Sequence, residues 1–116
     1  MNIAALANPD GFSPRLIADR LLTSVDDVAR SAGLGRDAVM RHDRIGSPKT
    51  QTRLREMLEV LNRVQPRFGS DLVAYAWYRS EPLMGFGGKT AMHLVGQGQA
   101  QDVMDYIDAV DAGIFA

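Results

Sequence analysis

Cysteine is absent from the 116-residue chain. This absence excludes disulfide bonds, thiol catalysis and cysteine-based metal sites, and it favours a reducing compartment. Every apolar stretch is far shorter than the roughly 20 residues that a membrane-spanning helix needs. The first 14 residues have no basic segment ahead of their short apolar stretch, which argues against a secretory signal. We therefore expect a cytoplasmic protein with no membrane segment.

A basic excess is also absent, since 13 lysines and arginines stand against 14 aspartates and glutamates. The chain as a whole is therefore not a basic nucleic-acid coat. The charge is unevenly distributed, however. Residues 13–67 carry a net charge of +4 and residues 68–116 a net charge of −4. The two halves consequently present opposite electrostatic surfaces.

No segment alternates between polar and apolar residues with the period of a strand, and apolar residues recur instead at helical spacing. The sequence predicts an all-α fold. Residues 1–12 form a lead-in with a turn at 9–11, and residues 66–69 form a hinge. Residues 71–79 are expected to bury Leu72, Val73, Ala76 and Trp77. The expected helices cover 14–22, 24–32, 36–44, 48–65, 71–79, 91–95 and 99–112.

Residues 25–42 have the pattern of a helix-turn-helix. A small residue is needed where the second helix crosses the first, and a glycine four residues later supplies the left-handed turn. The sequence provides Val28, Ala29, Gly33, Leu34 and Val39 at these offsets. The same residues would also suit a plain pair of crossed helices, so the pattern alone leaves both interpretations open.

Local charge favours the DNA-binding interpretation. Residues 30–55 contain seven basic and two acidic side chains, a net charge of +5. Residues near the start of a reading helix reach base edges, and surrounding basic residues neutralise phosphates. A monomeric module of this size would bind weakly, so DNA binding implies a dimer. The candidate groove contacts are Arg36, Arg41 and His42, and the candidate backbone contacts are Arg44, Lys49, Thr50 and Arg53.

Several apparent catalytic signals do not hold together. The sequence Gly88-Lys89-Thr90 resembles part of a P-loop, but the required earlier glycine is replaced by Leu83. The two histidines, His42 and His93, lie in different predicted helices without a metal-ligand spacing. We expect no enzyme activity, no metal and no cofactor.

The C-terminal half has a recognisable order of motifs. Trp77 is followed by the loop sequence Phe86-Gly87-Gly88-Lys89-Thr90, a short helix ending at Gly96 and Gly98, and a last helix closed by Gly113. This order resembles the Xre/MbcA/ParS-type toxin-binding domain of bacterial antitoxins. Ala91 stands where proline is usual in the family, which removes a preset first-turn φ but still permits the helix cap.

The resemblance implies a function by contact. Such antitoxins neutralise RES-domain toxins, which degrade NAD, by covering the entrance to the active site, and they commonly bind their own promoter. An acidic surface on this half would complement a cationic toxin entrance. The apolar C-terminal tip could insert into a partner pocket or fold back onto its own core. The candidate toxin contacts are Tyr78, Gly88, Lys89, Thr90, Asp108, Asp111, Gly113, Ile114, Phe115 and Ala116.

The sequence therefore predicts two regions with different partners. Residues 1–66 are expected to form a helix-turn-helix bundle for DNA binding and dimerisation, and residues 67–116 a small helical toxin-binding domain. The expected partners are a RES-domain toxin, promoter DNA and a second antitoxin chain, in a homodimer or a larger complex with toxin. The alternative is a stand-alone transcriptional regulator whose C-terminal half only dimerises.

Overall fold

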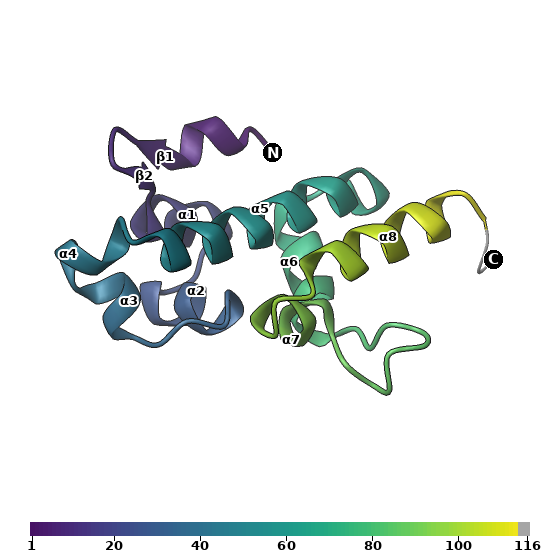
Figure 1. Ribbon diagram of the computed structural model, residues 1–116. Helices are drawn as coiled ribbons and strands as arrows, with labels where there is room; N and C mark the ends of the chain where they lie inside the picture. The colour runs from purple at the N-terminus through teal and green to yellow at the C-terminus, as the bar shows by residue number, and fades with distance from the viewer. Residues whose placement is uncertain (114–116) are drawn as a thin grey trace.

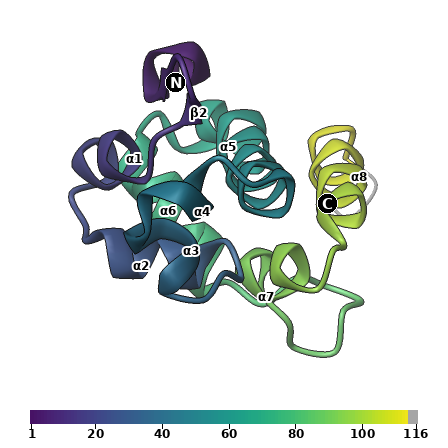
Figure 2. The same cartoon turned by 60° about the vertical axis from the view of Figure 1, so that its left-hand side comes forward.

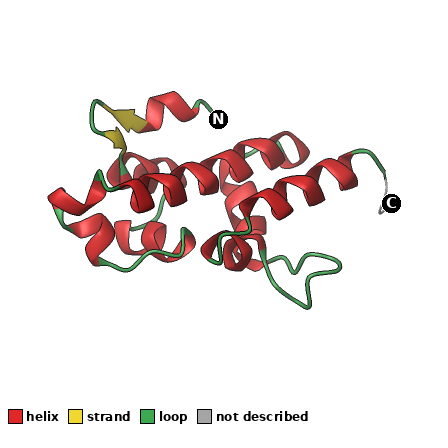
Figure 3. Cartoon of the chain, viewed as in Figure 1, coloured by secondary structure: helices red, strands yellow, loops and turns green. Residues whose placement is uncertain are grey.

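A computed structural model describes residues 1–113 and is built almost entirely of helices (Figure 1, Figure 3). The expected all-α fold is confirmed. Among the described residues, the one β-sheet is a hairpin of two strands near the N-terminus, each two residues long. The elements are η1 (Ile3–Leu6), β1 (Ala7–Asn8), β2 (Gly11–Phe12), α1 (Pro14–Leu21), α2 (Val25–Ser31), α3 (Asp37–Met40), α4 (His42–Ile45), α5 (Pro48–Phe68), α6 (Asp71–Ser80), α7 (Ala91–Gly96) and α8 (Ala100–Asp111).

The helix starts follow from local capping chemistry. The hydroxyl oxygens of Ser13, Ser24, Ser47 and Thr90 each accept a hydrogen bond from the backbone N–H three residues later, at 3.0 to 3.3 Å. These bonds satisfy N–H groups that have no partner within the helix. Serine and threonine are preferred at this position, so local chemistry determines these four helix starts.

Two predicted helix boundaries are wrong. The long helix does not end before Pro66 but continues to Phe68. The expected helix over 36–44 is interrupted at Arg41, whose ψ of 119° belongs to extended backbone. Two short helices, α3 and α4, replace it.

The predicted buried face of α6 is also wrong. Leu72 and Val73 are 42% and 48% exposed, and the buried side chains are Ala74, Tyr75 and Tyr78. The reason is that α6 packs against α5, α7 and α1 and is hydrogen-bonded to Ser31 of α2, so its two tyrosines face the interior. The larger aromatic side chains displace the aliphatic ones from the core.

A single apolar core runs through the protein and includes side chains of α1, α2, α5, α6, α7 and α8. The Tyr78 hydroxyl donates to the Ser31 carbonyl at 2.7 Å, and the Tyr75 and Ser31 hydroxyls are 2.6 Å apart. A Cβ placed on Gly33 would lie 2.4 Å from the Cα of Gly96. The helix-turn-helix is therefore packed directly against the C-terminal half. The boundary expected at residues 66 and 67 lies within the last turn of α5.

The molecule is elongated, with principal dimensions of 44 × 26 × 20 Å. Figure 1 places α3 and α4 at one end of the long axis, and the loop between α6 and α7 at the other. Helix α5 runs along the axis and connects the two ends. None of the helices among residues 1–113 has the length and apolar character to cross a membrane.

Candidate functional site

The loop between α6 and α7 projects from the body of the protein (Figure 1). Its base is closed by an antiparallel bridge between Pro82 and Thr90, and the Leu83 N–H donates to the Lys89 carbonyl at 2.9 Å. Leu83 is buried and anchors the loop, whereas Met84 at the tip is 61% exposed. The loop thus presents an apolar side chain on a closed turn.

The glycines of this loop adopt left-handed backbone conformations and have open space beside them. Gly85, Gly87 and Gly88 have φ values of +86°, +65° and +86°, and a Cβ on any of them would meet nothing within 4 Å. Left-handed backbone explains the need for glycine. The open space also means that a partner's backbone could approach the loop closely.

The far side of the loop is fixed to α7 and α8. Phe86 contacts Tyr106 edge to face, with ring centroids 6.0 Å apart. The Lys89 ammonium group donates to the Gln97 side chain at 3.3 Å, and the Thr90 hydroxyl caps α7. Gly88, Lys89 and Thr90, all predicted as toxin contacts, therefore lie together at the junction of the loop and α7. Gly88 and Lys89 are exposed and Thr90 is half-buried.

The aspartates of α8 fall into two groups. Asp108 pairs with Arg63, and Asp111 pairs with Arg67 at 2.7 Å, so these two carboxylates hold α8 against α5. The hydrogen bond from Arg63 and the charge of Asp108 raise the pKa of the Arg63 guanidinium. Asp102 and Asp105 instead accept hydrogen bonds from Gln99 and Gln101. The acidic surface expected on this half is therefore partly neutralised where Asp108 and Asp111 lie.

Tyr78 does not lie on the surface. Its side chain is 0% exposed and donates to the Ser31 carbonyl, and burial raises the pKa of its hydroxyl well above the ordinary value. The prediction that Tyr78 contacts the toxin is wrong, because its buried hydroxyl bonds α6 to α2. Tyr75 is buried in the same way.

The C-terminal candidates are only partly described. Gly113 follows the Ala112 cap of α8, has a φ of +82° and is exposed. This agrees with the expected role of Gly113 in closing the helix. The remaining candidates, Ile114, Phe115 and Ala116, lie outside the described residues.

The packing expected of a helix-turn-helix is present between α2 and α3. Val28, Ala29 and Val39 are buried at 0%, 2% and 4% exposure, Leu34 is half-buried, and Gly33 has a φ of +70°. The second helix is short, since α3 contains four residues before the interruption at Arg41. The side chains available to a DNA groove therefore come from α3, α4 and the turns beside them.

The residues predicted to contact the DNA groove and the phosphates differ in their exposure and in their ion pairing within the chain. Arg36 pairs with Asp26 at 3.3 Å and Arg41 with Asp43 at 3.7 Å, and both arginines are exposed. Arg53 is more enclosed. Its guanidinium group lies 2.8 Å from Glu56 and borders the backbone at Gly98.

Among the described residues, Arg44 and Lys49 are exposed and have no ion-pair partner. His42 is also exposed on α4. Thr50 is only 2% exposed, and its hydroxyl accepts a hydrogen bond from Ser47 at 2.9 Å. The prediction that Thr50 contacts a phosphate is wrong, because the hydroxyl belongs to the cap of α5.

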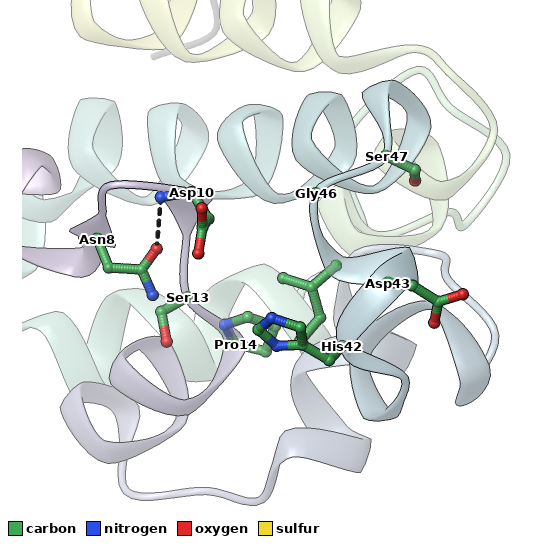
Figure 4. A pocket seen from close by; sticks show the side chains of 9 residues that line it. Asn8, Asp10, Ser13, Pro14, His42, Asp43, Gly46 and Ser47 are labelled. Atoms are coloured by element: carbon green, nitrogen blue, oxygen red, sulfur yellow. Dashed lines mark hydrogen bonds between the residues drawn. The ribbon is translucent and has the colours of Figure 1, made fainter.

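A pocket of about 550 Å³ opens beside these residues, between the N-terminal hairpin and α4 (Figure 4). Its lining combines apolar surface with the polar residues Asn8, Asp10, Ser13, His42 and Asp43. The Asn8 side chain accepts a hydrogen bond from the Asp10 N–H at 3.0 Å. Within residues 1–113, every buried side-chain polar atom has a partner, and no group of three potential metal ligands is present.

The sequence analysis did not predict the residues that form ion pairs between helices. Arg63 and Arg67 lie one turn apart on α5 and meet Asp108 and Asp111, which lie one turn apart on α8. The matching spacing was a usable signal, because residues separated by three or four positions share one helical face. Met84 was missed because an isolated methionine in a loop has no pattern.

The exposed Arg44 and Lys49, on α4 and at the start of α5, and the projecting loop beside α7 and α8 are separate features of one helical core, an arrangement that suits a binding protein. The comparisons with known proteins agree with this class. Residues 63–113 match the model of the antitoxin Xre/MbcA/ParS C-terminal toxin-binding domain, so this part of the chain is similar to that family. No curated protein matches the chain, and no solved structure matches it either. The family supports an antitoxin role in a toxin–antitoxin system.

Proposed function

We propose that this protein is a cytoplasmic antitoxin that neutralises a RES-domain, NAD-degrading toxin by covering its active site, and that it represses its own operon by binding promoter DNA. Residues 67–116 bind the toxin, and residues 1–66 bind DNA. The protein acts by contact, without catalysis and without a cofactor. The observation that carries the proposal is the toxin-binding family match at residues 63–113, over which the loop motif from Phe86 to Thr90 forms an exposed turn.

The toxin-binding surface consists of the loop at 81–90, the start of α7 and the adjoining face of α8. Met84 supplies an exposed apolar contact at the loop tip, and the left-handed glycines leave the backbone open to a partner. Buried apolar anchors surrounded by polar groups are the usual source of affinity at protein interfaces. The carboxylates of Asp102 and Asp105 add negative charge that suits the entrance of a site for an anionic dinucleotide.

Co-expression with a RES-domain toxin tests this function. We expect the full chain to co-purify with the toxin and to restore cellular NAD to the level of cells without toxin. Met84→Asp places a charge at the loop tip and is expected to weaken capture at least tenfold. Arg55→Ala, on the exposed face of α5, is the matched control and should neutralise as the wild type does. Normal neutralisation by Met84→Asp would remove the loop from the interface, and failure of the wild type to bind would overturn the proposal.

The C-terminal tip is a second proposed toxin contact. Deletion of Gly113 to Ala116 is expected to weaken neutralisation while leaving the helical circular dichroism spectrum and DNA affinity intact. The reason is that the apolar tip is proposed to enter a pocket of the toxin, and the truncated chain loses this contact. Equal protection of cells by the truncated and full chains would contradict a blocking role for the tip.

The DNA-binding surface combines α3 and α4 with the start of α5. Arg44 and Lys49 are supported as phosphate contacts because both are exposed and carry no ion pair among residues 1–113. In the chain, Arg41 lies between α3, the proposed reading helix, and the residues Arg44 and Lys49. A phosphate must compete with Asp43 for Arg41, and with Asp26 for Arg36.

Binding to the operon's promoter fragment is measured at several salt concentrations. Each lost phosphate contact makes the slope of log affinity against log salt less negative by about 0.9. We expect Arg44→Ala to produce such a loss, whereas Arg55→Ala, whose side chain pairs with Glu59, leaves the slope unchanged. No promoter shift, or an affinity that does not vary with salt, would remove DNA binding from the proposed function.

The second candidate function is a stand-alone transcriptional regulator. It is favoured by the packed helix-turn-helix, in which Val28, Ala29 and Val39 are buried around Gly33. It differs from the antitoxin function in needing no toxin gene nearby. Promoter binding without any toxin capture would favour it.

A further inference from the structure

The side chain of Gln51, in the first turn of α5, is bonded to two other segments of the chain. Its Oε1 accepts a hydrogen bond from the Phe12 N–H at 2.7 Å, and its Nε2 donates to the Phe12 carbonyl at 3.0 Å. The same Nε2 donates its second hydrogen to the Ile45 carbonyl at 2.9 Å. One carboxamide therefore holds both the N-terminal hairpin and the end of α4.

The three bonds require the chemistry of a carboxamide. They use one acceptor and two donors, and asparagine and glutamine are the side chains that offer this combination. Glutamate would accept from Phe12, but it would place a carboxylate against two carbonyl oxygens. Gly11 leaves room for the group, since a Cβ there would lie 2.5 Å from the Gln51 Oε1.

The bonds to Phe12 dock the hairpin as a neighbouring strand would. Opposed residues of an antiparallel pair can exchange N–H and carbonyl bonds, and here the Gln51 side chain takes the place of the opposed residue. Strand β2 lies beside α5 (Figure 2). Leu6 is buried at 3% exposure, and its carbonyl accepts from the Ser13 N–H at 2.9 Å. The hairpin is thus a fixed part of the fold.

Helix α4 depends on contacts from outside itself. It is a single turn, it has no buried residue, and its N-cap makes no side-chain hydrogen bond. A helix of this length is unstable by itself. The Ile45 carbonyl lies at its C-terminal end, where carbonyl groups lack a partner within the helix, and Gln51 supplies that partner. The hairpin turn lies close by, since a Cβ on Gly46 would be 4.0 Å from the Asp10 carbonyl oxygen (Figure 4).

We infer that Gln51 is a positioning residue, which fixes the direction of α4 by bonding the end of this helix to α5 and to the N-terminal hairpin. Arg44, which is exposed and carries no ion pair among residues 1–113, directly precedes the bonded Ile45. Gln51 is half-buried and acts through α4. The consequence for DNA rests on the proposed function, whereas the ordering of α4 does not.

Amide hydrogen exchange of the full chain without DNA, followed by NMR, tests the ordering of α4. In Gln51→Ala, the Phe12 N–H loses its acceptor and the Ile45 carbonyl loses its donor. We expect the Phe12 and Ile45 amides to exchange roughly fivefold faster, which is the factor that one ordinary hydrogen bond supplies. The Ile45 N–H reports on α4 because it donates to the Arg41 carbonyl at 3.2 Å. Amides in the middle of α5 should exchange as they do in the wild type.

Gln65→Ala is the matched control for this measurement. Gln65 is a half-buried glutamine of the same helix, and its side chain makes no hydrogen bond among residues 1–113. We expect this variant to leave the Phe12 and Ile45 rates unchanged. Wild-type exchange of both amides in Gln51→Ala would overturn the inference.

Gly11→Ala gives a second test in which Gln51 is retained. Its Cβ would displace the carboxamide, so the Ile45 amide should again exchange faster than in the wild type. The double variant Gly11→Ala/Gln51→Ala should exchange at Ile45 as Gln51→Ala alone does, because the same bond is already lost. Additive increases at Ile45 would show that the two residues act separately, which contradicts the positioning role.

Binding to the operon's promoter fragment measures the consequence for the proposed function. Gln51→Ala should make the slope of log affinity against log salt less negative by about 0.9, because a misplaced α4 loses the phosphate contact of Arg44. Arg44→Ala should then change the slope no further in the Gln51→Ala background. A wild-type slope for Gln51→Ala would overturn the link between this residue and DNA. No promoter binding by the wild type would instead remove DNA binding from the proposed function, and the Ile45 exchange rates would still decide the inference.

Discussion

Gly33 meets two requirements at one position. Its φ of +70° forms the turn of the helix-turn-helix, and its Cα approaches Gly96 so closely that a Cβ would lie 2.4 Å from the Gly96 Cα. The positive φ of the turn favours glycine. The contact with Gly96 also excludes asparagine and aspartate, which tolerate positive φ but carry a Cβ. Gly88 differs, because it has a φ of +86° and open space around it.

Gly33→Ala is therefore expected to destabilise the protein more than Gly88→Ala. Left-handed backbone costs alanine about 1–2 kcal/mol at either position. Overpacking against α7 adds about 1–3 kcal/mol at Gly33 alone. Urea denaturation of both variants measures the difference. Equal losses of unfolding free energy would mean that α7 moves aside without cost.

Tyr78 is the residue through which alkaline pH acts on the fold. Burial, and to a smaller extent Tyr75 and Glu56, raise the pKa of its hydroxyl well above the ordinary value of about 10. The unfolded chain loses this proton near pH 10, whereas the native protein keeps it. Stability that is present below pH 10 is consequently lost as the pH rises further.

Tyr78→Phe separates this ionisation from packing. At neutral pH the variant leaves the Ser31 carbonyl without its donor, which should cost about 1–3 kcal/mol. Above pH 10 its unfolding free energy should fall less steeply than that of the wild type, because the buried group no longer ionises on unfolding. Denaturation midpoints at pH 8 and pH 11 test both parts, and parallel slopes would assign the alkaline loss to other groups.

At the scale of elements, the four aspartates of α8 differ in how far their charges are compensated. Asp108 and Asp111 are compensated by Arg63 and Arg67 of α5, while Asp102 and Asp105 accept hydrogen bonds from the side-chain amides of Gln99 and Gln101. Exposed ion pairs of this kind contribute about 0.2–1 kcal/mol each. The charge available to a partner is therefore greatest at the start of α8.

Asp102→Asn and Asp105→Asn should slow association with a cationic toxin more than Asp108→Asn and Asp111→Asn do. Uncompensated charges steer encounter, and salt screens them. Surface plasmon resonance at low and high ionic strength measures the association rate of each variant. If the paired aspartates have the larger effect, the toxin takes them from their arginines, and the four aspartates act together.

Elements that depend on local chemistry were predictable, and those that depend on neighbours were not. The caps at Ser13, Ser24, Ser47 and Thr90 follow from the side chain and the turn after it. The buried face of α6 does not. Both LVxxAW and the two tyrosines have helical spacing, and only the position of α2, with Ser31 as hydrogen-bond partner, selects the tyrosines.

The same limit applied to the candidate surfaces. The loop motif from Phe86 to Thr90 could be predicted from its resemblance to the family, because its residues are contiguous in the sequence. Thr50 and Tyr78 were misplaced, since their hydroxyls are occupied by partners that only the fold identifies. Charge counts likewise could not show that Arg63 and Arg67 compensate part of the acidic half.

At the scale of the whole molecule, the opposite charges of the two halves conceal a shared interior. Ser31 of α2 is bonded to both buried tyrosines of α6, Gly33 touches Gly96, and α5 contributes to the core on both sides of the expected boundary. Neither half can open without exposing side chains of the other. The physical consequence is one cooperative unit.

Truncating a core side chain in α1 should therefore lower the unfolding free energy of the C-terminal half by the same amount as that of the N-terminal half. Ile17 is 0% exposed, and Ile17→Ala is expected to cost about 2–5 kcal/mol. Trp77, the single tryptophan, lies on α6 and reports on the distant half. Its fluorescence and the far-ultraviolet circular dichroism should show coincident urea transitions, both shifted by the full amount in the variant. A Trp77 transition that stays at the wild-type midpoint would show that the halves unfold separately, because loss of α1 packing would then not reach α6.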